Sequence, residues 1–143
     1  MKSRKGFTLI ELMVVVLIVG ILAAVAIPIL RGRIDAAKWS EGKAMMGSIA
    51  TAIRAYHAEK GPAGTAPTSI WGASDTTLGF VANQDTMGTY FGDIDFTSLT
   101  VVMEPFSFII ECTAGSGGLG DATDAPTNPA GYRLDETGTF TAF

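Results

Sequence analysis

The sequence is poor in the side chains on which most catalytic and metal sites depend. Its 143 residues include one cysteine, Cys112, and one histidine, His57. A single cysteine excludes an internal disulfide, and a lone histidine with no paired nucleophile and no metal-ligand spacing provides no catalytic set. We therefore expect a protein that is not an enzyme. We interpret Cys112 as a small core residue and His57 as a solvated or dipole-compensating residue near a helix end.

Basic residues are almost absent from the second part of the chain. Residues 61–143 contain one, Arg133, against ten acidic residues, whereas residues 1–60 contain nine basic and four acidic residues. Phosphate groups are bound through lysine and arginine, so this distribution argues against nucleic acid as the primary partner of the acidic head. It favours attraction between the basic arm of one copy and the acidic head of another, or cations bound on the head.

Apolar residues, by contrast, are concentrated near the N-terminus. The run Phe7–Leu30 is 24 residues long and contains one charged residue, Glu11. A bilayer core of about 30 Å needs about 20 apolar residues in a helix, so this run is long enough to cross a membrane. The basic residues Lys2, Arg4 and Lys5 predict that the N-terminus stays in the cytoplasm and that the head lies on the other side.

Three interpretations of the apolar run differ in their treatment of Glu11. A secretory signal cut after Ala26 would release a soluble exported protein that starts at Ile27, and a permanent anchor would hold the acid in the bilayer; neither gives Glu11 a role. Cleavage between Gly6 and Phe7 does, because it exposes an amino group four residues before the carboxylate on one helix face. That pair could form within one chain or between neighbours, where it would set register. Compensation of the helix dipole is the simpler alternative.

The residues Lys5-Gly6-Phe7-Thr8-Leu9-Ile10-Glu11-Leu12, before an apolar stretch that ends Ala26-Ile27-Pro28, resemble the class III signal of type IV pilins and of the related type II secretion pseudopilins. The resemblance implies that a prepilin peptidase removes residues 1–6 and methylates the amino group of Phe7. It implies that Glu11 governs docking into a helical homo-oligomeric filament built by an inner-membrane assembly platform. It also implies a compliant helix between Gly20 and Pro28, which agrees with the cost of both residues in a helix interior.

The same helix is predicted to continue from Phe7 to about Lys60. Small and apolar residues recur every three or four positions beyond residue 31, and Gly61-Pro62 provides a stop signal. We expect residues 31–60 to be an amphipathic helix on which the head packs. The predicted packing stripe consists of Ile34, Ala37, Glu41/Ala44, Met45, Ser48/Ile49, Ala52/Ile53 and Tyr56.

The acidic head, residues 61–143, is predicted to be β-rich. A connecting loop over 61–77, anchored by Trp71, precedes the strand-like segments, which are Leu78–Ala82, Ile94–Met103 and Phe106–Thr113, with a closing hairpin of 131–134 and 138–141. In Phe106–Thr113, Phe108, Ile110 and Cys112 share one face. The predicted fold is α+β: a long N-terminal helix, with a membrane-spanning half and an amphipathic half, packed against a small antiparallel sheet in the shape of a ladle.

A glycine-rich loop near the C-terminus raises the question of a bound cofactor. Residues 115–120 formally satisfy G-x-G-x-x-G, but residues 121–129 contain two prolines and cannot form the helix that a dinucleotide site requires. Asp121 and Asp124 are weak candidates for calcium ligands, with Asp93 and Asp95 elsewhere in the head, and solvated acids are the alternative. The resemblance bears on this point, because major pseudopilins carry a calcium loop there whereas many pilins use a disulfide, which this chain lacks.

The parts of the chain thus predict a subunit that polymerises: a leader (1–6), a filament-core helix (7–30), an amphipathic helix (31–60) and a head (61–143). Two functions remain open. One is the major pilin of a surface fibre for adhesion, motility or DNA uptake, which crosses the inner membrane once before assembly and is extracellular afterwards. The other is the major pseudopilin of a periplasmic type II secretion piston.

Overall fold

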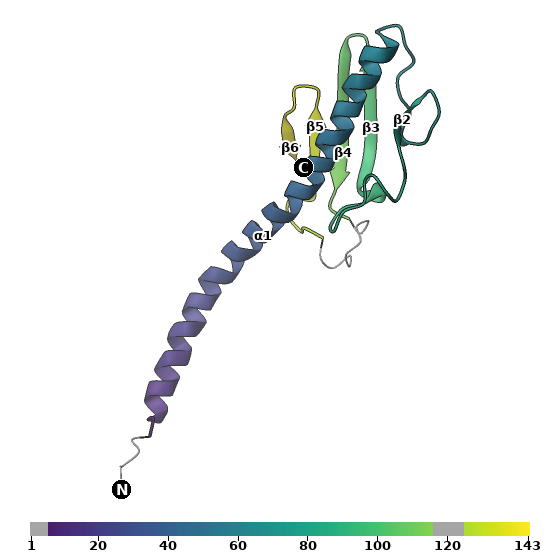
Figure 1. Cartoon of the computed structure of the whole chain (residues 1–143). Coiled ribbons are helices and arrows are strands. Elements are labelled where there is room, and N and C mark those ends of the chain that lie inside the picture. Colours follow the sequence, from purple (N-terminus) through teal and green to yellow (C-terminus); the bar gives the residue numbers. More distant parts are fainter. Residues whose placement is uncertain (1–5, 116–124) are drawn as a thin grey trace. The chain divides into compact units, whose positions relative to one another are not determined.

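The computed structural model describes residues 6–115 and 125–143 (Figure 1). The chain divides into two compact units between Ile34 and Asp35. The elements, in chain order, are helix α1 (Leu9–Lys60), strands β1 (Ser69–Trp71) and β2 (Thr77–Phe80), a short 3-10 helix η1 (Asp93–Asp95), and strands β3 (Phe96–Met103), β4 (Phe106–Thr113), β5 (Gly131–Asp135) and β6 (Phe140–Ala142).

In the first unit, the described chain enters helix α1 at Leu9 and stays helical to Ile34, with Pro28 inside the helix. This helix is long and apolar enough to cross a membrane. Its large apolar side chains are exposed on all sides up to Leu30. Because such a surface is unfavourable in water, this part of the helix requires lipid or other protein around it.

The second unit contains a four-stranded antiparallel sheet in the order β3-β4-β5-β6. This confirms the predicted α+β fold, including the closing hairpin. Strand β4 covers the predicted range Phe106–Thr113, and Phe108, Ile110 and Cys112 are buried on one face as expected. The prediction was wrong for residues 61–77, since β1 lies inside the expected loop and pairs in parallel with β2 in a separate two-stranded sheet.

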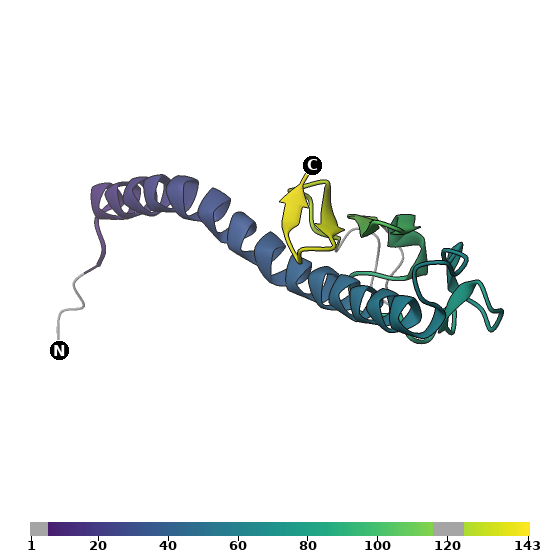
Figure 2. The same cartoon turned by 90° about the horizontal axis from the view of Figure 1, so that it is seen from above.

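Helix α1, from Asp35 onward, lies along one face of the four-stranded sheet (Figures 1 and 2). The core between them joins Trp39, Ile49 and Ile53 of the helix to side chains of the sheet. The sheet contributes Phe96, Phe108, Ile110, Cys112 and Leu134. Burial of a large apolar side chain contributes about 1.5–3 kcal/mol, so this interface is the main source of stability of the head.

The predicted packing stripe was only partly correct. The helix buries Asp35, Trp39, Gly42, Met46, Ile49, Ala50, Ile53 and Tyr56. Of the predicted positions, Ile49, Ile53 and Tyr56 belong to this set, whereas Ile34 is exposed. Gly42 is buried because the ring of Phe91 lies against it, and a Cβ atom at Gly42 would come within 3.1 Å of that ring.

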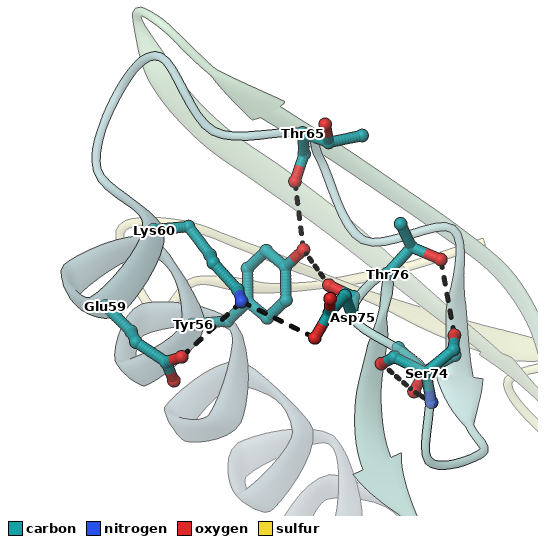
Figure 3. A network of polar contacts seen from close by, with 8 residues as sticks. Tyr56, Glu59, Lys60, Thr65, Ser74, Asp75 and Thr76 are labelled. Atoms are coloured by element: carbon teal, nitrogen blue, oxygen red, sulfur yellow. Dashed lines mark hydrogen bonds and ion pairs between the residues drawn. The ribbon is translucent and has the colours of Figure 1, made fainter.

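Polar contacts fix the connection that follows helix α1. The helix ends at Lys60, and Gly61, with φ +72°, donates its N–H to His57 O at 2.9 Å, as the stop signal predicts. The Tyr56 hydroxyl lies 3.0 Å from Thr65 O and 2.7 Å from Asp75 O, and Lys60 reaches Glu59 and Asp75 (Figure 3). The segment between β1 and β2 is therefore tied to the last turn of the helix.

His57, expected from the sequence to be solvated or to compensate the helix dipole, lies in the last turn of helix α1 and contacts the head. Its Nε2 lies 3.2 Å from Met103 O, and its ring packs 4.1 Å from the ring of Phe106. The two partners flank the turn between β3 and β4. His57 therefore attaches this turn to the end of helix α1.

Candidate functional site

The N-terminal end of helix α1 is closed by a reciprocal contact between Thr8 and Glu11. Glu11 Oε2 accepts hydrogen bonds from the Thr8 backbone N–H at 2.9 Å and from its hydroxyl at 2.7 Å. The Glu11 N–H donates in return to Thr8 Oγ1 at 3.4 Å. This is a capping box, in which a threonine at the N-cap and a glutamate three residues later satisfy amides that the helix leaves unpaired.

The capping box determines where the helix begins. The sequence predicted a helix from Phe7, but Gly6, Phe7 and Thr8 lie before the first helical residue, Leu9. The bond between Gly6 and Phe7 is therefore outside the helix, and Phe7 is 85% exposed. The pattern Thr-x-x-Glu before an apolar run is a recognised start signal, so Thr8 could have been identified from the sequence.

A continuous apolar surface follows the capping box. One groove, of about 660 Å³, is lined by Ile10, Leu12, Met13, Val14, Val16 and Leu17. Glu11 lines a second groove of about 410 Å³ together with Phe7, Ile10, Val14 and Val15. The one acidic side chain of the apolar run thus lies beside Phe7 on an otherwise apolar face.

Gly20 and Pro28 both lie inside helix α1, at places where the side chains are exposed. A Cβ atom at Gly20 would meet nothing within 4 Å, so contacts in the described chain do not require glycine there. Pro28 has no N–H to donate to the carbonyl of Ala24, four residues earlier. Both residues therefore weaken the helix over the same stretch without breaking it.

Asp93 and Asp95, the two candidate calcium ligands that the structure describes, already accept hydrogen bonds within the head. Asp95 is 1% exposed, and its Oδ2 accepts the Gly92 N–H at 2.9 Å. Asp93 accepts hydrogen bonds from the Asn83 N–H and the Thr86 hydroxyl. Asp121 and Asp124 lie outside the described residues. Within residues 6–115 and 125–143, no three His, Cys, Asp or Glu side chains are grouped in a way that could hold a metal ion.

Cys112 is a core residue, as the sequence predicted. Its side chain is fully buried on the inner face of β4. Burial, reinforced by the negative charge of Asp95, raises the pKa of the Cys112 thiol to about 12. The thiol is therefore protonated, and unreactive as a nucleophile, at neutral pH.

Two carboxylates of helix α1 hold segments of the head: Glu41, which the sequence analysis placed in the packing stripe, and Asp35, which it did not single out. Asp35 Oδ2 accepts the Thr127 hydroxyl at 2.8 Å and the Asn128 N–H at 3.2 Å. Glu41 Oε1 accepts the N–H groups of Tyr90 and Phe91 at 2.8 and 3.1 Å. Because both take hydrogen bonds from remote backbone, they position the head along the helix.

Comparison with known protein families gives a match at the N-terminal end of the chain. A family described as the prokaryotic N-terminal methylation motif matches residues 1–27. This range contains the bond between Gly6 and Phe7, the capping box and Gly20. No solved structure matches the chain significantly.

Several curated proteins are similar over a longer range. The chain is 39% identical to the type IV major fimbrial protein FimA of Dichelobacter nodosus over 134 residues, which cover 85% of this chain and 73% of the relative. It is 37% identical to the fimbrial protein EcpC of Eikenella corrodens over 55% of this chain and 46% of the relative. It is 35% identical to the type IV major pilin protein PilE of Neisseria gonorrhoeae over 64% and 50%. The chain thus spans about half the length of EcpC and PilE.

Proposed function

This chain belongs to the type IV pilin family, and on that premise we propose that it is the major subunit of a surface filament. Its relatives are fimbrial proteins, so the expectation that it is a structural protein and not an enzyme is confirmed. One observation carries the proposal: an exposed apolar helix, with one acid in its first turn, leads into a folded head. Such a helix requires a non-aqueous environment, which a filament core made of copies provides.

The first step that we propose is removal of residues 1–6 by a prepilin peptidase, with methylation of the new amino group of Phe7. Support comes from the match to the N-terminal methylation motif and from the position of the cleaved bond before the helix start. A protease needs its substrate in an extended, accessible conformation, and a bond inside helix α1 would first have to be unwound. The capping box keeps the bond between Gly6 and Phe7 out of the helix.

The second step is docking, for which we propose that Glu11 pairs with the amino group of Phe7 in a neighbouring copy. The hydrogen bonds from Thr8 fall on Oε2. Oε1 has no partner within the described chain, and a carboxylate oxygen accepts further donors. One carboxylate can therefore cap its own helix and also form an ion pair with a positive charge on another copy. An unpaired charge in an apolar core is strongly unfavourable, so the pair would select one register.

Before assembly, the subunit is proposed to cross the inner membrane once through residues 7–30, with the N-terminus in the cytoplasm. In the filament, the helix between Gly20 and Pro28 is proposed to be its most compliant part, because both residues weaken helical hydrogen bonding there. Adhesion, motility and DNA uptake are the roles that such a fibre would serve. The pilus is preferred to a secretion piston because the similar curated proteins given above are fimbrial or pilin proteins.

Two measurements on cells that express the chain with a type IV assembly system test the proposal. Mass spectrometry of the mature protein should show a methylated Phe7 at its N-terminus. An N-terminus at Ile27 would instead establish ordinary signal cleavage and would exclude the filament. Electron microscopy of sheared surface material should show long fibres that contain this chain, whereas a methylated subunit confined to the periplasm would indicate the secretion piston.

A further inference from the structure

We propose that Arg31 and Arg33 of one copy bind the acidic end of the head of another copy. The acidic end is defined here by Glu104 and Glu136, which lie in two turns of the sheet. This contact lies outside the pairing of Glu11 with Phe7, and it rests on the proposed function only in requiring that copies assemble.

Arg31 and Arg33 differ from the other basic residues of the described chain, because neither makes a hydrogen bond, ion pair or ring contact there. Both side chains are exposed. The remaining basic residues are engaged within their own subunit: Lys38 over Tyr90, Lys43 over Tyr132, Arg54 on Glu136 O, Lys60 on Glu59 and Asp75, and Arg133 on Glu111. Among the described basic side chains, Arg31 and Arg33 are thus the two that remain available to bind another molecule.

The acidic end is made by strand register. Met103 pairs with Phe106 across the turn that contains Glu104, and Ile109 of the same β4 strand pairs with Asp135, which precedes Glu136. Both turns therefore lie at one end of the sheet, which Figure 1 shows beside the last turns of helix α1. Glu104 and Glu136 are exposed, and among the described residues their carboxylates have no partner.

The head cannot neutralise this end with its own basic residues. Arg54 reaches the turn, but its hydrogen bond goes to the backbone carbonyl of Glu136, at 3.2 Å, and not to the carboxylate. Arg133, the one basic residue of the head, is committed to Glu111. The adjacent Asp135 adds a further negative charge, because hydrogen bonds from Thr137 and Thr139 hold the pKa of its carboxyl group below the usual range.

The two unmatched surfaces have opposite charge, so in an assembly of copies the arginines of one subunit can meet the acidic end of another in a head-to-tail contact. A contact between unlike surfaces does not close on itself in general and produces a helical array. Arg33 also borders a groove of about 460 Å³ lined by Ala26, Ile27, Ile29 and Leu30. An apolar floor lowers the local dielectric constant and strengthens an ion pair made beside it. Val102, 41% exposed and two residues before Glu104, is an apolar side chain suited to that floor.

The test is charge reversal in the full chain, with filament yield in the sheared fraction divided by the processed subunit that remains in the membrane. We expect Arg31→Glu/Arg33→Glu and Glu104→Lys/Glu136→Lys each to lower this ratio on the order of tenfold or more, because like charges then face each other. All four changes combined, or co-expression of the two double variants, should restore most of the yield. Asp85→Lys is the control, because it reverses a charge at the opposite end of β3. Asp85 accepts a hydrogen bond from the Val81 N–H, and the neighbouring Asn83 N–H binds Asp93, just before β3.

Thermal unfolding of each purified variant in detergent checks that the head is folded. The proposal is overturned if the Arg31/Arg33 double variant assembles at normal yield, or if the combined variant is no better than either double variant. Both outcomes leave the proposed function intact, provided that the unmodified chain forms fibres. If the unmodified chain is methylated at Phe7 but forms no fibres, the failure belongs to the proposed function instead.

Discussion

Glu11 Oε2 accepts two hydrogen bonds from Thr8, one from the backbone N–H at 2.9 Å and one from the hydroxyl at 2.7 Å. The acid in the apolar run therefore has a local task that is complete within one chain. Pairing with an amino group of a neighbour would be a second task of the same carboxylate. The two tasks make different demands, because a cap needs an acceptor oxygen whereas an ion pair needs a negative charge.

Glu11→Gln separates these demands. Glutamine retains an acceptor for the Thr8 N–H, and glutamine is accepted at this position of a capping box. We expect the helix to begin at Leu9 as before, but filament yield to fall on the order of tenfold or more, because a buried amino group loses its counter-charge. The measurements are helical content in detergent micelles and the amount of sheared filament.

Thr8→Val is the matched variant for the capping task. It removes the hydroxyl but retains the carboxylate, so the cap should weaken by about 1 kcal/mol while the charge remains. Exchange of the Glu11 and Leu12 amides should become roughly five-fold faster, and most filament should still form. Normal assembly of Glu11→Gln, together with failure of Thr8→Val, would show that the acid serves the cap alone.

Asp35→Ala should destabilise the head. The change removes the buried carboxylate that accepts hydrogen bonds from the Thr127 hydroxyl and the Asn128 N–H, two groups on exposed residues. The expected loss is about 1–3 kcal/mol in the free energy of unfolding, measured by denaturant titration of the intact subunit in detergent. Thr127→Val removes one of the two hydrogen bonds and should cost about 1 kcal/mol. Equal stability of Asp35→Ala and the unmodified chain would contradict the assigned role.

Tyr56→Phe should loosen the segment between β1 and β2. The hydroxyl is the group that links helix α1 to Thr65 O and Asp75 O (Figure 3). We expect a cost of about 1 kcal/mol and faster proteolysis within residues 61–77. Lys60→Met is the control, since it leaves the Tyr56 hydroxyl in place and removes the ion pairs with Glu59 and Asp75, which contribute about 0–1 kcal/mol, together with the contact of Lys60 with the Tyr56 ring. Proteolysis that responds to Lys60→Met but not to Tyr56→Phe would reverse this assignment.

The raised pKa of Cys112 predicts how head stability depends on alkaline pH. In the unfolded chain the thiol ionises near its ordinary pKa of 9.0, whereas in the folded head it stays protonated to about 12. Between these values the unfolded state binds fewer protons, so this thiol should lower the free energy of unfolding by about 1.4 kcal/mol per pH unit. Its contribution is intact below pH 9 and is lost progressively up to pH 12.

Comparison with Cys112→Ala isolates this effect. The difference in unfolding free energy between the two proteins should shrink as the pH rises through this window. The native thiol should also resist alkylation at pH 8.5 until the head is unfolded. Rapid alkylation of the folded protein at that pH would show that the thiol is accessible, in conflict with its burial.

Local signals in the sequence were sufficient for the long helix, for strand β4 and for the closing hairpin. Periodicity and the Gly61-Pro62 stop fix the end of the helix, and alternation fixes the inner face of β4. Strand β1 was missed because its pairing with β2 is parallel and has no hairpin turn to indicate it. The helix start at Leu9 was not predicted. Because Phe7 is apolar, the sequence predicted it as the first residue of the helix, although the capping-box pattern that begins at Thr8 indicates a later start.

The packing face of the helix could not be predicted, because two of its members are not apolar. Asp35 is buried through hydrogen bonds to residues more than ninety positions away. Gly42 is buried through Phe91, which is brought to it by the fold of the head. The predicted stripe therefore included neighbouring positions such as Ile34 and Ala37, which are exposed.

The contact between Gly42 and Phe91 fixes the position of the head along helix α1, because the ring of Phe91 packs directly against the glycine. One turn to either side, the helix carries Lys38 and Met46, whose side chains would occupy the space of the ring. Moving the head along the helix by one turn would thus bring the Phe91 ring against Lys38 or Met46 in place of Gly42. Only one position of the head along the helix is therefore sterically allowed. Every copy would then hold its sheet at the same position along residues 35–60 of its own helix, a prerequisite for repeating units that must match their neighbours.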